Sequence, residues 1–177
     1  DLCNYGFWRC YDQSWSQKDF FEYGQFVEKN LIEYPYNQII QLSNKKNKKI
    51  NLGILSADLK TGHSITFFLK TILLNYNKDE IDIYLISNQK DFTKVSTEIT
   101  NLVFKTIDIS QLSDLDALNK IRNLNLDIMI DVMGYTSRNR IGLFKNRIAK
   151  KQVIWMGYCN TTGLKNMDYI ISDQNLI

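Results

Sequence analysis

Blocks of apolar residues alternate with polar segments along this chain, and their spacing changes near residue 50. From Ile50 onward the chain contains short apolar runs of strand length, at 50–57, 81–87, 104–109, 126–133, 152–157 and 168–172. Segments with apolar residues at helical spacing lie between them, at 64–77, 91–102, 112–124 and 137–147. Strands that alternate with helices through short links predict an α/β fold with a doubly wound, mostly parallel sheet.

Two segments indicate how this sheet is covered. The run Leu126–Met133 is apolar at nearly every position, as expected for a parallel strand that is buried on both faces. Leucine and isoleucine recur every three residues from Leu112 to Leu124, which suits a helix lying on such a sheet. The pattern therefore predicts a sheet enclosed between helices.

The first 49 residues follow a different pattern. An aromatic-rich stretch at 5–15 has no regular period, so we expect it to be irregular. Ser16 suits the N-cap of a helix running to about Glu33, and the Tyr34-Pro35 pair ends that helix. We interpret residues 1–49 as a helical linker segment docked on an α/β domain at 50–177, with the basic cluster at 45–49 as a solvated connection.

Composition narrows the class of protein. The chain has 177 residues, 44% of them hydrophobic and 23% charged, which suits one globular domain. The net charge of +3 is too small to predict binding to nucleic acid or to a membrane surface. No apolar segment approaches the about 20 residues of a membrane helix, and we expect no signal peptide. We expect a cytoplasmic protein, and we expect this chain to be part of a longer one.

Cysteine and histidine usage excludes the common metal sites. The three cysteines, Cys3, Cys10 and Cys159, show no CxxC spacing, and His63 is the only histidine. Cys3 and Cys10 are close enough in sequence to face each other, but nothing else indicates a disulfide scaffold. We therefore predict no metal and a reducing compartment.

Candidate chemistry gathers where the predicted strands end, because ligands bind at the carboxyl ends of parallel strands. The residues there are rich in hydroxyls, amides and glycines, which suits a polyhydroxylated or phosphorylated ligand. They include no paired carboxylates and no GxGxxG dinucleotide motif. His63 stands out because imidazole handles protons near neutral pH. The alternative is that His63 is a helix cap or a surface residue.

Three further positions have both structural and functional interpretations. Asp58 either caps the following helix and holds its turn or contacts a ligand. Gly134 and Gly157 are most simply explained by positive φ or by close backbone approach at strand ends.

Four segments carry a resemblance to a known family, in the same order and spacing. They are 53–68, with Gly53–Asp58 and His63–Phe68, then 107–110, 127–136, and 155–173. Together they resemble the opening of the catalytic region of the O-linked N-acetylglucosamine transferases, glycosyltransferase family 41. The helix over 19–33 is similar to the one that joins this family's tetratricopeptide repeats to its catalytic region.

The resemblance implies a two-lobed glycosyltransferase of the GT-B type, with this chain as its Rossmann-like, acceptor-side N-terminal lobe. The nucleotide-binding C-terminal lobe and the upstream tetratricopeptide repeats are then expected elsewhere in the parent chain. The family transfers N-acetylglucosamine, or fucose in some plant members, from a nucleotide sugar to serine or threonine of proteins, with inversion and without a metal. The expected partners are a UDP-sugar donor and a protein or peptide acceptor, with no cofactor.

The resemblance also assigns roles to residues. His63 matches the family histidine at the donor–acceptor junction, which acts as a base or as a positioning residue, so it is the catalytic candidate. Gly157 and its neighbours match the loop that lies against the sugar. The substrate-binding candidates are Asp58, Gly134, Tyr135, Thr136, Gly157, Tyr158, Thr161 and Thr162.

The chain departs from the family pattern at three places. Four residues, 59–62, separate Asp58 from His63 where the family usually has three, and Lys105 stands where animal members carry a second histidine. The family's Gly-Tyr-Pro-Gly is here Gly157-Tyr158-Cys159-Asn160. These changes keep two alternatives open: a degenerate, non-catalytic lobe that acts as a binding or scaffolding module, and a generic α/β domain that binds a small polar metabolite.

Overall fold

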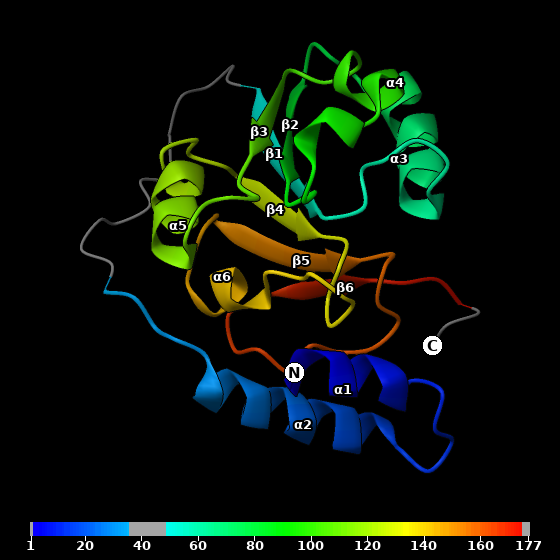
Figure 1. Cartoon of the computed structure of the whole chain (residues 1–177), viewed down its shortest axis with the longest axis vertical. Coiled ribbons are helices and arrows are strands. Elements are labelled where there is room, and N and C mark those ends of the chain that lie inside the picture. Colours follow the sequence, from blue (N-terminus) through cyan, green and yellow to red (C-terminus); the bar gives the residue numbers. More distant parts are fainter. Residues whose placement is uncertain (1, 36–48, 175–177) are drawn as a thin grey trace.

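A computed structural model describes residues 2–35 and 49–174 and contains one six-stranded parallel sheet in the order β3-β2-β1-β4-β5-β6 (Figure 1). The strands are β1 (Ile50–Ser56), β2 (Ile81–Ser87), β3 (Lys105–Asp108), β4 (Ile128–Asp131), β5 (Lys151–Trp155) and β6 (Tyr169–Ile171). The chain adds β2 and β3 on one side of β1, then returns to add β4, β5 and β6 on the other. This order confirms the predicted doubly wound α/β fold.

Helices cover both faces of the sheet, so the fold has a helical layer on each side of one sheet (Figure 1). They are α1 (Leu2–Arg9), α2 (Gln17–Asn30), α3 (Ser64–Asn75), α4 (Thr97–Thr100), α5 (Asp114–Arg122) and α6 (Ile141–Lys145), with a 3-10 turn, η1, at Phe92–Lys94. One apolar core lies between the sheet and the helices α3 and α4. A second core lies on the opposite face, under α2, α5 and α6.

Successive side chains along each strand point to opposite faces of the sheet and so contribute to both cores. In β1, Ile54 belongs to the core under α3 and Leu55 to the core under α5 and α6. In β5, Val153 and Ile154 divide in the same way. Successive side chains of a strand point to opposite faces, so a strand between two helical layers must be apolar at every position. This explains the continuous apolar runs in the sequence.

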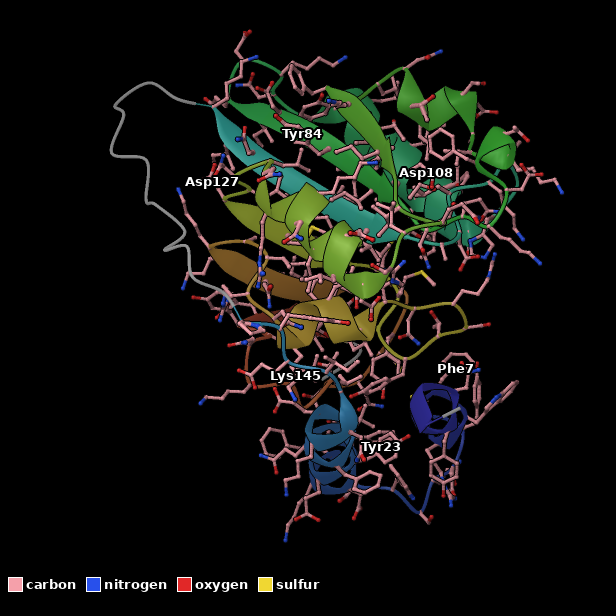
Figure 2. The ribbon with its side chains drawn as sticks, turned by 60° about the vertical axis from the view of Figure 1, so that its left-hand side comes forward. Phe7, Tyr23, Tyr84, Asp108, Asp127 and Lys145 are labelled. Atoms are coloured by element: carbon pink, nitrogen blue, oxygen red, sulfur yellow. The ribbon has the colours of Figure 1, made fainter. Side chains whose placement is uncertain are left out.

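The N-terminal helices pack against the sheet domain and share its core. Ser16 caps α2 with a capping box, in which its side chain accepts from the Asp19 amide and the Asp19 carboxylate accepts from the Ser16 amide. Val27 is 1% exposed in the core under α5 and α6. Lys145 of α6, labelled in Figure 2, donates to the Glu28 and Leu31 carbonyls and so satisfies the end of α2.

Some predicted elements differ from the structure. The stretch predicted to be irregular begins with the helix α1, because aromatic side chains that obscure a helical period pack on one another and on α2. The helix expected at 91–102 is reduced to η1 and α4, since Val95 bridges Lys60 and the Ser96 amide donates to the Leu59 carbonyl. The helix expected at 137–147 begins only at Ile141. Residues 36–48, which hold most of the predicted connection, lie outside the described residues.

The strand β6 forms one edge of the sheet and pairs with β5. All three of its residues are exposed, and Tyr169, Ile170 and Ile171 keep between 47% and 55% of their surface in solvent. This edge therefore presents apolar side chains as well as backbone.

Candidate functional site

The strand order places a topological switch between β1 and β4, where the chain leaves the sheet in opposite directions. The register aligns Leu55 of β1 with Asp131 of β4, so both strands end at the same edge. Figure 2 shows the two edges: Asp127, which precedes β4, marks the amino edge, and Asp108, which ends β3, marks the carboxyl edge. The candidate site is built from the loops at this carboxyl edge.

Unusual backbone conformations concentrate in these loops. Six described residues have positive φ, and five of them lie in loops that follow strand carboxyl ends: Gly62, Gly134, Arg138, Met156 and Gly163. Arg138 and Met156 are not glycine, so each carries a conformational cost of order 1–3 kcal/mol. Such strain is typical of segments that position a ligand-binding surface.

His63 lies at the end of the β1–α3 loop and caps α3. Its Nδ1 accepts a hydrogen bond from the Ile65 amide at 3.3 Å. Because Nδ1 acts as an acceptor, the neutral ring carries its proton on Nε2. That Nε2 lies 3.9 Å from Asp58 Oδ1, and the side chain is 30% exposed. His63 is thus both the predicted cap and a partly exposed donor at the site.

Asp58 joins the loop after β1 to the loop after β4. Its Oδ1 accepts from Arg138 Nη2 at 2.9 Å, and its carbonyl accepts from the hydroxyl of Thr66 on α3. The interpretation of Asp58 as the cap of α3 is wrong, because His63 occupies that position. The Asp58 carboxylate instead holds Arg138 beside His63, and its side chain is 17% exposed.

Arg140 organises the other half of this edge. Its guanidinium donates to Asp114 at 2.8 Å, to the Asn88 side chain at 3.1 Å, and to the Ile109 and Leu112 carbonyls. The side chain is only 12% exposed, so these contacts are shielded from water. One arginine therefore ties the ends of β2 and β3 to the loop after β4.

Asp131 is the last residue of β4 and lies beside the topological switch. Its two carboxylate oxygens accept from the amides of Met133 and Gly134 at 2.9 and 3.0 Å. The side chain is buried, and this burial raises the pKa of Asp131 to about 7 although both hydrogen bonds favour the charged form. The loop after β4 is therefore fixed by a buried carboxyl group that holds its proton more firmly than an exposed aspartate does.

The loop after β5 packs tightly on the loop after β4. A Cβ on Gly157 would lie 1.9 Å from the Val132 carbonyl oxygen, and a Cβ on Gly134 would lie 2.4 Å from the Cβ of Tyr158. Gly134 also has a φ of +53°. The prediction of positive φ or close backbone approach at these two glycines is confirmed.

Buried tyrosines form the floor beneath these loops. Tyr135 is fully buried and its hydroxyl donates to the Thr162 carbonyl at 2.6 Å. Its ring packs edge-on against Tyr158 and against Tyr23 of α2. Tyr23 is labelled in Figure 2, where it lies on α2 beneath the sheet domain. Burial raises the pKa of Tyr158, so this ring remains neutral.

The residues predicted to bind substrate divide into two groups by exposure. Five of the nine predicted site residues, including the catalytic candidate, reach the surface in part: Asp58, His63, Thr136, Gly157 and Thr161. The other four are buried in the packing between loops and helix α2: Gly134, Tyr135, Tyr158 and Thr162. The first group is able to contact a ligand directly, whereas the second can only shape the surface that the first presents.

A pocket of about 570 Å³ opens beside His63 along α3. Its walls combine His63, Phe67, Phe68 and Leu74 with the charged side chains Lys70 and Glu98. Lys70 and Glu98 form an ion pair at 2.6 Å across one side of it. The pocket is large enough for a sugar or for a side chain of a bound peptide.

The sequence did not predict that two residues connect the loops at this edge. Neither Arg140 nor Asn88 is among the predicted site residues. Burial is what separates Arg140 from its exposed neighbour Arg138, and a single sequence does not give burial. The one usable signal was position, since both residues follow a predicted strand end.

Two absences hold within residues 2–35 and 49–174. No group of three His, Cys, Asp or Glu side chains is placed to hold a metal ion. Within the same residues, no helix has the length and apolar character needed to cross a membrane.

Comparison with known proteins decides the family. The model of glycosyl transferase family 41 matches residues 24–176. The chain belongs to family 41. Over 144 residues it is 30% identical to a probable UDP-N-acetylglucosamine–peptide N-acetylglucosaminyltransferase SPINDLY from Petunia hybrida, covering 78% of this chain and 15% of that protein. A UDP-N-acetylglucosamine–peptide N-acetylglucosaminyltransferase from Caenorhabditis elegans is 27% identical over 135 residues, covering 75% of the chain and 12% of the relative.

A solved structure gives the same fold. A mutant of the Thermobaculum terrenum O-GlcNAc transferase superposes with a TM-score of 0.75 at 22% identity, covering 89% of this chain and 30% of that one. The predicted family and the predicted Rossmann-like architecture are both confirmed. The chain spans about one seventh of the length of the Petunia relative, so it contains only one part of a family 41 protein.

Proposed function

We propose that this chain is the acceptor-side lobe of an inverting protein O-glycosyltransferase. The complete protein would transfer N-acetylglucosamine from UDP-N-acetylglucosamine to serine or threonine of proteins, without a metal. Membership of family 41 and the activities named for the relatives support this proposal. The nucleotide-binding lobe and tetratricopeptide repeats would be supplied by other parts of a longer chain.

The observation that carries the proposal is the position of His63. It stands in the loop at the carboxyl end of β1, beside the topological switch, where it lines a pocket and its Nε2 lies 3.9 Å from Asp58. An extra residue precedes it compared with the family, and Gly62 accommodates this longer turn with a φ of +80°. The turn thus still delivers the imidazole to the start of α3.

The hydrogen bond at Nδ1 favours one of the two roles considered for His63. A neutral ring that accepts from the Ile65 amide donates from Nε2, so it orients an acceptor hydroxyl rather than removing its proton. To act as a base, the ring would first have to give up its cap of α3. We therefore propose positioning of the acceptor hydroxyl, with Asp58 and Arg138 holding the ring in place.

The exposed residues of the loop after β5 would face the sugar. The backbone at Gly157 and the hydroxyl of Thr161 offer neutral hydrogen-bonding groups at the carboxyl edge, and Thr136 offers another from the loop after β4. The Thr161 side chain accepts from the Gly163 amide at 3.1 Å, which fixes its orientation. Neutral donors and acceptors of this kind suit the hydroxyl and acetamido groups of N-acetylglucosamine.

Transfer activity of the parent protein tests the proposal. His63→Asn keeps a side-chain acceptor for the Ile65 amide, whereas it removes Nε2. We expect sugar transfer to a protein acceptor to fall by about 100-fold, the scale of a misplaced reacting group. His63→Gln places an amide group near the former Nε2, so it should recover part of that loss.

The outcomes separate the proposal from its alternative. The unsubstituted protein is expected to transfer sugar; if it transfers none, this lobe is the degenerate, non-catalytic module. Unchanged turnover in His63→Asn would remove His63 from the reaction while leaving the lobe assignment standing. The 177-residue chain alone should bind UDP-N-acetylglucosamine weakly, and tight binding by isothermal titration would contradict the assignment of the nucleotide site to another lobe.

A further inference from the structure

Two cysteines far apart in sequence meet at the junction between α1 and the loop after β5. The Nδ2 atom of Asn160 lies 3.6 Å from the sulfur of Cys10 and 4.0 Å from the sulfur of Cys159. Cys159 is exposed and Cys10 is partly buried, and both are free thiols. One amide group therefore has a thiol from each segment beside it.

The two thiols also affect each other directly. Burial raises the pKa of the Cys10 thiol, and the neighbouring Cys159 thiol raises it further, partly through a side-chain hydrogen bond. Because both sulfurs lie within 4.0 Å of the same Asn160 nitrogen, they are neighbours, and the about 2.05 Å of a disulfide requires the Cys159 side chain to move towards Cys10. Cys159 lies in a loop at the surface, so the movement does not require a core side chain to shift.

We propose that Cys10 and Cys159 form an oxidation site, in which a low-molecular-weight disulfide such as glutathione disulfide oxidises the two thiols to a disulfide bond that links the residue after α1 to the loop after β5. In the first step, the exposed Cys159 thiolate attacks glutathione disulfide, forming a mixed disulfide and releasing one glutathione thiolate. In the second step, the Cys10 thiolate attacks the Cys159 sulfur and releases the second glutathione thiolate. The protein loses two protons and two electrons, and one glutathione disulfide becomes two glutathione molecules.

The order of attack follows from exposure. Cys159 is open to a molecule as large as glutathione, whereas Cys10 is partly enclosed and holds its proton more firmly. Once the mixed disulfide has formed on Cys159, the Cys10 sulfur is already its neighbour. The resulting bond would fix the segment that contains Gly157 and Thr161 to a helix at the other end of the chain.

Peptide mapping tests this directly, because trypsin separates all three cysteines. Cleavage after Arg9, Lys18, Lys151 and Lys165 gives the peptides 1–9, 10–18 and 152–165, which each contain one cysteine. The folded chain is incubated with glutathione disulfide at pH 8.5, alkylated, and digested without reduction. We expect peptide 10–18 to be recovered mainly as a disulfide with 152–165, and to be released from it by dithiothreitol.

Three controls make the result specific to the fold. Cys3→Ser should leave the link in place, and Cys159→Ser should abolish it. In 6 M guanidinium chloride the chain should instead join 1–9 to 10–18, because closing the short loop is favoured about 100-fold over closing the long one. If the folded chain gives 10–18 joined to 1–9, or only separate glutathione adducts, the proposed oxidation site is wrong.

Discussion

The buried carboxyl group of Asp131 should make the stability of this chain depend on pH in an unusual direction. Burial raises the pKa of Asp131 to about 7 in the folded chain, compared with about 3.9 in an unfolded one. The folded state therefore binds this proton more tightly. The associated stability is fully present below pH 3.9 and is lost as the pH rises towards 7.

The size of the effect follows from the two pKa values. Between pH 5 and pH 7.5, an acid with these values lowers the free energy of unfolding by about 2.5 kcal/mol. With a urea dependence of about 2 kcal/mol per molar for a chain of this size, the unfolding midpoint should fall by about 1 M. Carboxylates whose pKa is lowered, such as Asp19 and Asp168, act in the opposite direction, but they do so at more acidic pH.

Asp131→Asn isolates this contribution. Asparagine cannot ionise, and its single amide oxygen keeps one of the two hydrogen bonds to the Met133 and Gly134 amides. We expect a pH-independent loss of about 1–3 kcal/mol from the missing bond. The pH dependence of urea unfolding, measured by tryptophan fluorescence at pH 5 and 7.5, should shrink by the amount calculated above, because every other group contributes equally to both proteins. An identical pH dependence in the two proteins would refute the reasoning.

Three further expectations concern stability measured by urea unfolding. Gly24→Ala should lose at least about 1–3 kcal/mol, because its Cβ would lie 2.1 Å from a carbonyl oxygen of the loop after β5, whereas the exposed Gln25→Ala should change little. Arg140→Met should cost several kcal/mol of unfolding free energy, because it removes the contacts to four partners of a side chain that is 12% exposed. Arg138→Met should cost less than about 1 kcal/mol, because it removes an ion pair of a side chain that is 40% exposed, and equal losses would contradict this argument. His63→Ala should lower the free energy of unfolding by about 1 kcal/mol more than His63→Asn does, because only asparagine keeps an acceptor for the Ile65 amide. Equal losses in the two variants would show that the cap of α3 contributes nothing to stability.

The sequence predicted the sheet well because its strands are buried on both faces. A strand that is buried on both faces is apolar at nearly every position, as in β4, and this pattern is distinct from that of an exposed segment. The glycines at 134 and 157 were also predictable, since tight contacts at strand ends leave few other choices. Ser16 was predictable as a cap because its hydroxyl and the carboxylate three residues later form a local motif.

What the sequence did not predict depends on contacts between distant segments. The helix expected at 91–102 is interrupted because the chain at Val95 and Ser96 pairs with the loop after β1, and nothing local encodes that partner. The contact of Asp58 with Arg138 was not predicted for the same reason, as Arg138 lies 80 residues away. Likewise, the difference between exposed and buried members of the candidate site arises from how α2 covers the loop after β5. The roles of those residues in substrate binding stay predictions.

The exposed apolar edge at β6 has a practical consequence for anyone who produces this chain on its own. An unpaired strand edge with Tyr169, Ile170 and Ile171 in solvent is a template on which a second molecule can add a strand. The isolated chain should therefore self-associate as its concentration rises, and a lysine in place of Ile170 is expected to keep it monomeric in light scattering. Crystallisation and titration of this chain are best planned with that substitution.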